Sequence, residues 1–300
     1  MRFLLAQLVL AALVTASQTP TVLTRSFWSG PEPESPRLPA EGFSLDFALR
    51  PATSATGPTL ELLASARLPG PIAEIYGARA EGATQVVAVD SATGAVFSRP
   101  AEREGAAPLS AVIGSRPRAS RTSGATIDSI EVWFNADLRS HLGLPPEAET
   151  YSVFLWLDEM TSPLRLARVP ASGEPPSHAS PPVIASGIHF RNSRLSPHPP
   201  EGGLVLRTGS ASHPSAIIYG AADIKGLSSP NLILTVLALD SSTRQLSWRT
   251  FLVSLRDLKA SGGAFEFEPA AFFRLPKGGQ GRLFLAAVVP QALSNVVAVQ

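Results

Sequence analysis

Histidine is a common metal ligand, and four of the five histidines of this chain lie in one proline-rich stretch. They are His178, His189, His198 and His213. A metal site needs ligands that converge from fixed elements. No two of these histidines have the i, i+4 spacing of a helix face or the i, i+2 spacing of a strand face. The spacing therefore indicates exposed loop side chains, and we expect neither a metal nor another cofactor.

Paired carboxylates cleave glycosidic bonds when they face each other across a cleft. Acidic residues near the predicted strands are Glu131, Asp137, Asp158, Glu159, Glu266 and Glu268. Each falls in a turn or at an outward position of an alternating segment, which is typical of surface charge. The chain has no cysteine and no G-x-S-x-G nucleophile motif. We predict no catalytic residues. Whether the chain is an enzyme stays open, but the sequence favours a non-enzyme.

Exposed aromatic rings can stack on sugars or on partner chains. Trp133 and Trp248 lie in short alternating segments, and we take both as candidate ligand or partner contacts, with core packing as the alternative. The run Val153–Leu157 is apolar on both faces, which indicates a central strand or a strand whose second face meets another domain. We therefore expect Trp156, within that run, to lie in the core.

A short pattern of residues occurs twice along the chain. Ile75–Ala78 and Ile218–Ala221 both read Ile-Tyr-Gly-Ala, 143 positions apart (218 − 75). Val87–Thr93 and Leu237–Thr243 share the order apolar-Ala-apolar-Asp-Ser-x-Thr, 150 positions apart (240 − 90). In each copy an arginine follows the aspartate after nine positions (99 − 90 and 249 − 240). Such a repeat predicts two similar domains.

The repeat places two tyrosines, Tyr76 and Tyr219, at equivalent positions. They are candidate ligand or partner contacts, or else core tyrosines that bury a ring and keep a hydrogen bond for the hydroxyl. Weaker matches pair Leu60 and Leu62 with Leu204 and Leu206, Ile130–Phe134 with Ala264–Phe267, and Val153–Leu157 with Leu283–Ala287.

Most of the chain after residue 43 consists of short alternating segments between turn signals, which is typical of half-buried strands. Asp90 and Asp240 are predicted to form turns, because an aspartate side chain accepts hydrogen bonds from nearby backbone amides. One short helix is expected over Asn135 to Leu144, with Asn135 as its N-cap.

The first residues resemble an export signal in composition. Arg2 precedes an apolar run from Phe3 to Leu13, and small residues follow up to Ala16. Without Arg2 the chain has 24 basic (25 − 1) and 24 acidic residues, so nucleic acid is not an expected partner. No second long apolar segment follows, so we expect no integral membrane span in the mature chain. A cysteine-free exported chain suits the bacterial cell envelope.

These observations predict an all-β fold of two tandem β-sandwich (Ig-like) domains, possible products of an internal duplication, with little helix. The expected boundaries are a signal peptide at 1–16, a proline-rich tether at 17–42, domain 1 at 43–175, a Pro/Ser/His-rich linker at 176–203 and domain 2 at 204–300.

The function expected from this organisation is a non-catalytic structural or protein-interaction module, secreted or periplasmic, with a protein or a polysaccharide of the cell envelope as its partner. One alternative is a carbohydrate-binding module that uses exposed Trp133 and Trp248. A hydrolase with a cleft between the domains is a second and less favoured alternative. Clefts between domains are common ligand sites, so the region between the two halves is the first place to look for a site.

Overall fold

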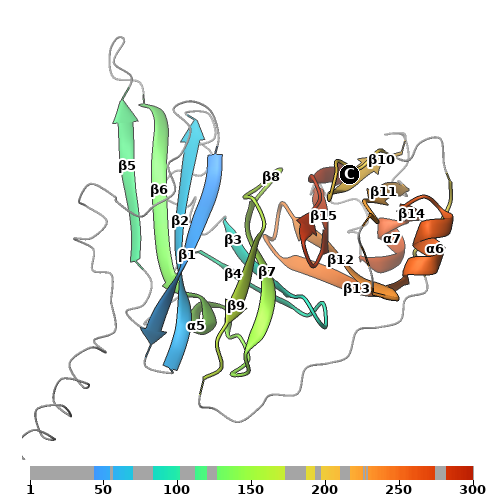
Figure 1. The fold of residues 1–300 in the computed structure, drawn as a ribbon. Coiled ribbons are helices and arrows are strands. Elements are labelled where there is room, and N and C mark those ends of the chain that lie inside the picture. The colour runs from blue at the N-terminus through green and yellow to red at the C-terminus, as the bar shows by residue number, and fades with distance from the viewer. Residues whose placement is uncertain are drawn as a thin grey trace, which may run out of the picture.

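The computed structural model describes residues 44–54, 57–69, 84–101, 112–119, 127–172, 187–192, 197–209, 217–225, 227, 229–273 and 282–299. The expected signal peptide and tether lie outside these ranges. Within them the chain is mostly strand, arranged in four antiparallel sheets that make two similar sandwich-like halves (Figure 1). The predicted all-β architecture with two tandem domains is confirmed.

The first half contains two sheets. Sheet A has the order β1 (Ser44–Ser54), β2 (Gly57–Pro69), β6 (Ile127–Asp137) and β5 (Val112–Ala119). Sheet B has the order β4 (Val96–Pro100), β3 (Gln85–Asp90), β7 (Glu149–Leu157) and β8 (Met160–Thr161), and β9 (Arg165–Val169) also pairs with β7. A short helix, α5 (Leu138–Leu142), follows β6.

The second half follows the same plan. Sheet C has the order β10 (Leu204–Thr208), β11 (Ile218–Ala222) and β14 (Ala264–Phe267). Sheet D has the order β13 (Leu246–Ser254), β12 (Asn231–Asp240), β15 (Leu283–Val289) and β16 (Ala292–Leu293), and β17 (Val297–Val299) also pairs with β15. Helix α6 (Leu255–Ala260) precedes β14 and α7 (Pro269–Phe272) follows it.

Sheets B and D match strand for strand and residue for residue. Val87 lies opposite Phe154 in sheet B, and Leu237, 150 positions after Val87 (237 − 87), lies opposite Ala286 in sheet D. Ala286 is 132 positions after Phe154 (286 − 154), and these two offsets hold through both sheets. The match extends to the order β1-β2-β6 in sheet A and β10-β11-β14 in sheet C.

One of the weaker sequence matches is displaced by one strand. Leu60 and Leu62 lie in β2, whereas Leu204 and Leu206 lie in β10, which has the place of β1 in its sheet. The apolar alternation is the same in neighbouring strands, so pattern alone does not distinguish them. The Ile75–Ala78 copy lies outside the described residues, and its counterpart Ile218–Ala221 lies in β11.

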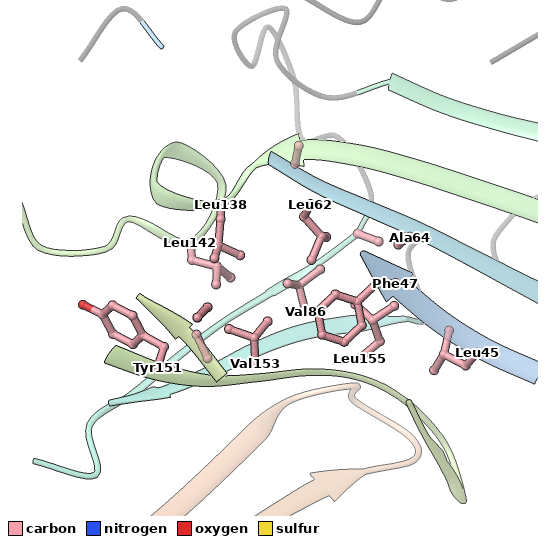
Figure 2. Packing of buried hydrophobic residues seen from close by; sticks show 14 of the residues in the cluster. Leu45, Phe47, Leu62, Ala64, Val86, Leu138, Leu142, Tyr151, Val153 and Leu155 are labelled. Carbon is pink, nitrogen blue, oxygen red and sulfur yellow. The ribbon is translucent and has the colours of Figure 1, made fainter. Parts of the chain in front are cut away.

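Each half has its own apolar core between its two sheets. In the first half, Leu45, Phe47 and Leu62 of sheet A pack toward Val86 and Val153 of sheet B (Figure 2). In the second half, the core lies between sheets C and D and includes Leu206, Ile218, Val236, Phe267 and Leu285. Alternate residues of β3, β7, β12 and β15 contribute to these cores, which leaves the other residues of the same strands for a second face.

The predicted helix exists but begins later than expected. Its N-cap is Asp137, whose carboxylate accepts a hydrogen bond from the Ser140 amide at 2.8 Å, and Gly143 ends it with φ +65°. Asn135 still belongs to β6. The strand continues because Asn135 and Ala136 pair with Leu63 and Leu62 of β2, and these ladder bonds outweigh the capping preference of an asparagine.

Part of the expected linker packs on the second half. Ile188 and Phe190 lie against its core, and the His189 backbone pairs with Glu266 of β14. This short bridge lies at the edge of sheet C that corresponds to the place of β5 in sheet A. The segment 187–190 therefore extends sheet C rather than only connecting the halves.

Candidate functional site

The two halves meet through the second faces of sheets B and D. A buried apolar cluster joins Val87, Val89, Val96, Phe154 and Trp156 of the first half to Leu237, Leu239, Phe284, Ala286 and Val288 of the second. The four sheets thus stack in the order A, B, D, C (Figure 1). The predicted second face of Val153–Leu157 is this contact, and Trp156 is fully buried in it, as expected. In the region between the halves, where a ligand cleft is expected from the sequence, the described side chains form a packed layer.

The repeated aspartates shape the two hairpin turns that border this layer. Asp90 Oδ1 accepts hydrogen bonds from the amides of Ala92 and Thr93 at 2.7 and 2.8 Å. Asp240 Oδ1 accepts from Ser242 and Thr243 in the same way, at 2.7 and 3.1 Å. The prediction that both aspartates form turns is confirmed. Their repetition reflects backbone geometry rather than catalysis.

Each of these turns has a backbone carbonyl that accepts a hydrogen bond from the opposite half. The Gly94 carbonyl accepts hydrogen bonds from Thr235 Oγ1 at 3.3 Å and from Thr250 Oγ1 at 2.8 Å. The Arg244 carbonyl, 150 positions later (244 − 94), accepts from Gln85 Nε2 at 3.3 Å. Gln85 and Thr235 are themselves equivalent (235 − 85 = 150). The contact is therefore reciprocal, as it is in a two-fold dimer.

We predict that Gly94→Ala destabilises the protein more than Gly143→Ala. Both glycines have positive φ, +71° and +65°. A Cβ at Gly94 would lie 2.3 Å from Thr250 Cγ2 and 2.7 Å from Ile233 Cγ2, whereas a Cβ at Gly143 meets nothing within 4 Å. Each variant costs about 1 kcal/mol for the left-handed backbone, and steric overlap adds about 1–3 kcal/mol at Gly94 only. Urea unfolding measures both. Equal losses would contradict the close contact of this turn with sheet D.

Trp248 lies at the rim of the contact between the halves. It pairs with Leu237 on the face of sheet D that meets sheet B, and 45% of its surface is exposed. The backbone of Trp133 lies in β6 between Ser65 and Gly114, and its side chain is outside the described part of the structure. Of the two candidate tryptophans, the structure thus describes an accessible ring for Trp248.

The strand that carries Trp248 is an edge strand of a different kind from its counterpart in the first half. β4 has five residues, exposes Arg99 and ends in Pro100. β13 has nine residues, and Thr250 stands at the position equivalent to Pro100 (250 − 100 = 150). Among the described strands, β13 pairs with β12 alone. Short length, charge and proline protect natural edge strands. Both strands expose an arginine, Arg99 on β4 and Arg249 on β13, but β13 lacks the short length and the proline.

Tyr219 lies on the outer face of sheet C, half-buried. In register with it are Arg207 of β10 and Glu266 of β14, and Glu266 is followed by His189 across the isolated bridge. These four residues form a row across the sheet. Glu266 Oε1 also forms an ion pair with Arg191 Nε at 3.3 Å. Tyr76, the equivalent candidate, lies outside the described residues.

The sequence offers His189 as a possible metal ligand and Glu266 as a possible catalytic acid, and it singles out neither Arg207 nor the row as a whole. Glu266 was assigned to the exposed surface, yet only 8% of it is exposed, because Arg191 and its strand neighbours cover it. The alternation of Phe265, Glu266 and Phe267 does indicate that Glu266 faces away from the core. It does not indicate which side chains lie beside it, since that depends on the pairing of distant strands.

Three of the carboxylates considered for hydrolysis, Asp137, Asp158 and Glu266, have structural partners, and Glu159 and Glu268 are exposed. Asp137 caps α5 and accepts from Thr59 Oγ1 at 3.2 Å. Asp158 forms an ion pair with Arg244 across the two halves at 3.2 Å, and burial raises the pKa of Asp158 above its ordinary value. No group of three or more metal-binding side chains occurs in the described ranges.

Burial shifts the pKa of two ionisable groups of the first half strongly. Tyr151 is completely buried, and burial together with the Asp90 carboxylate raises the pKa of its hydroxyl above the ordinary value. Burial and the nearby Arg99 lower the pKa of His141, in α5, to about 4, although its hydrogen bond to the backbone of Pro100 acts in the opposite direction. Both groups are therefore neutral near pH 7. They stabilise the packing around α5 in their neutral forms.

No family model matches the chain, and no curated protein matches it. In the parts of the chain that the structure describes, none of the helices is long and apolar enough to cross a membrane.

Proposed function

We propose that this chain is a non-catalytic module of the cell envelope or the extracellular space that binds a protein partner along β13. The observation that carries the proposal is the long edge strand with Trp248 exposed beside it. An extended segment of a partner can add to such an edge as a further strand, with main-chain hydrogen bonds for affinity and side-chain contacts for specificity. Export supplies the location, and the signal-like residues 1–16 support it.

The comparison between the halves supports β13 rather than β4 as the binding edge. The residue equivalent to Trp248 is Ser98 (248 − 98 = 150), and the residue equivalent to Thr250 is Pro100. Both halves have the same strand order, so the same backbone carries a closed edge in one copy and an open edge in the other. Tryptophan is also the residue type most enriched at the energetic centres of protein interfaces.

We predict that Trp248→Ser weakens partner binding at least about 30-fold, the effect of losing one interface hot spot of about 2 kcal/mol. This variant gives β13 the side chain that β4 has at the same position. A photoreactive residue at Ser247, exposed on the same strand, captures the partner from an envelope extract. Hydrogen exchange of the complex then measures protection of the β13 amides. Ser247→Ala is the matched control and keeps full binding.

The outcomes distinguish the candidate functions. Protection confined to β13, lost with Trp248→Ser, supports strand addition by a protein. Capture of the partner that is unchanged in the Trp248→Ser variant contradicts strand addition at β13. Release of reducing sugar from envelope polysaccharide by the purified protein would instead support a hydrolase.

Carbohydrate binding is the second candidate, and the exposed Trp248 ring favours it as well. The ring would stack on a sugar ring, and the backbone edge of β13 would then have no role. Soluble polysaccharide in a native gel retards the wild-type protein in this case. Trp248→Phe keeps a stacking surface and retains binding, whereas Trp248→Ser loses it. No protection of the β13 amides accompanies this mode.

A further inference from the structure

The apolar layer between the halves is built from equivalent positions of the two repeats. Twelve of its fourteen members pair off as Val87 with Leu237, Val89 with Leu239, Val96 with Leu246, Phe154 with Ala286, Trp156 with Val288, and Leu164 with Val296. The other two, Phe284 and Leu293, have the polar residues Ser152 and Thr161 as their equivalents. The first three pairs are 150 positions apart and the last three are 132 apart (for example 246 − 96 and 288 − 156). Each half uses the same surface toward the other, which is the defining property of an isologous dimer interface.

The side chains of these pairs differ in a compensating way. On β3 and β4 the first half has valines where the second half has leucines on β12 and β13. On β7 the first half has Phe154 and Trp156, where the second half has Ala286 and Val288 on β15. Close-packed interiors tolerate no large change of volume. The order is reversed at one further position, where the first half has Ser152 and the second half has Phe284 (284 − 132 = 152). Two first halves would therefore bring together two copies of Phe154 and Trp156, and two second halves would bring together two copies of Phe284.

The polar contacts between the halves also favour an unlike pair, that is, a first half with a second half. The reciprocal bonds from Thr235 to the Gly94 carbonyl and from Gln85 to the Arg244 carbonyl occur once in each direction. Two further contacts join a residue of the first half to a residue of the second without a reciprocal counterpart among the described residues. They are the ion pair of Asp158 with Arg244, and the hydrogen bond from Ser152 Oγ to the Pro290 carbonyl at 2.7 Å. An unlike pair of halves therefore satisfies polar groups that a like pair would not.

We propose that the faces of sheets B and D form a dimerisation surface that the chain carries twice and that selects unlike halves. Non-covalent contacts are sufficient to hold the first half to the second, so that a first half cut from its own chain pairs in trans with the second half of another copy. The partner of each face is the other repeat of this same protein. The inference does not rest on the proposed binding at β13, because it concerns the buried layer between sheets B and D, whereas the proposed partner binds the backbone edge of β13 at the rim of that layer.

The full chain tests this with a protease recognition sequence inserted after Ser177, within the expected linker. The folded protein is cut and then analysed by size-exclusion chromatography with light scattering. We expect one species with the mass of the intact chain and an unchanged strand signal in circular dichroism. Separation of the fragments at micromolar concentration, or loss of the strand signal on cutting, would overturn the proposal.

Equivalent substitutions in the two halves provide the second arm. Val87→Glu and Leu237→Glu each place a charge in the apolar layer, and we expect each to raise the dissociation constant of the cut protein at least about 100-fold, as a buried unpaired charge requires. Ser247→Glu, at an exposed position of β13 that points away from the layer, is the control. If either charged variant fails to fold uncut, Gln85→Met and Thr235→Val remove one reciprocal hydrogen bond each. We expect about a fivefold weaker association from each. Unchanged association in these variants contradicts the assigned surface.

Mixing shows the selection directly. Cut wild-type protein and cut ¹⁵N-labelled protein are unfolded together in urea, refolded, and weighed by native mass spectrometry. Hybrid pairs of a light first half and a heavy second half are expected in statistical proportion, without like pairs. Abundant like pairs would overturn the selection of unlike halves, and an absence of hybrids beside reformed parental pairs would overturn pairing in trans.

Discussion

Replacement of Trp156 by alanine is expected to lower the free energy of unfolding by about 3–5 kcal/mol, the range for truncating a buried large aromatic side chain. The ring is fully buried in the layer between sheets B and D, and its indole nitrogen donates to the Asp158 carbonyl at 2.7 Å. Both the apolar area and the hydrogen bond are lost. Because the ring belongs to the contact between the halves, we also expect the single unfolding transition to separate into two.

Trp248→Ala is the matched control, since this tryptophan is 45% exposed and lies on the rim of the same layer. We expect it to cost less than about 1 kcal/mol, as for surface substitutions. Trp156→Phe keeps most of the apolar area and should lie between the two. Urea unfolding followed by circular dichroism gives all three values. A loss for Trp156→Ala as small as that for Trp248→Ala would show that the layer does not couple the halves.

Acidification is expected to destabilise the protein through His141. Its pKa is lowered from 6.5 to about 4 in the folded state, so between these values the unfolded chain binds a proton that the folded chain does not. Stability therefore falls as pH decreases through this window. The contribution is on the order of 3 kcal/mol, since each pKa unit corresponds to about 1.4 kcal/mol.

The variant His141→Gln isolates this effect, because other groups also titrate in acid. Unfolding free energies are measured at about pH 7 and about pH 4.5 for both proteins, within the window set by the two pKa values. The wild type should lose more stability between them than the variant does. An NMR titration of the His141 ring gives the folded pKa directly. Equal losses in both proteins, or a ring that titrates near its ordinary value, would contradict burial of the neutral imidazole.

The parts of the fold that could be predicted from the sequence are those determined by residues close together in the chain. Alternation identified the strands, and the two Asp-Ser-x-Thr segments identified equivalent hairpins because the aspartate bonds to amides two and three residues away. The doubly apolar run Val153–Leu157 indicated a strand between two layers, since a strand with water on one side would carry polar residues there.

The features that escaped prediction depend on distant strands. α6 begins at Leu255, where the alternation of β13 continues in the sequence, and its N-cap is Ser254. Leu246 and Trp248 share a face, but one is covered by the first half and the other is exposed at its rim. Nothing within β13 distinguishes these two environments. The difference arises from where sheet B ends, which only the three-dimensional structure gives.

Two halves in one chain have a consequence for how the protein tolerates dilution. A pair of separate subunits dissociates when its concentration falls below the dissociation constant, and a protein outside the cytoplasm, as we propose for this one, is open to such dilution. A covalent connection makes the association intramolecular, so that it no longer depends on the protein concentration. The connection between Val169 and Leu204 therefore keeps the stoichiometry at one to one at any protein concentration. Because the two faces of the contact are encoded separately in one chain, a mutation can change one face without changing the other.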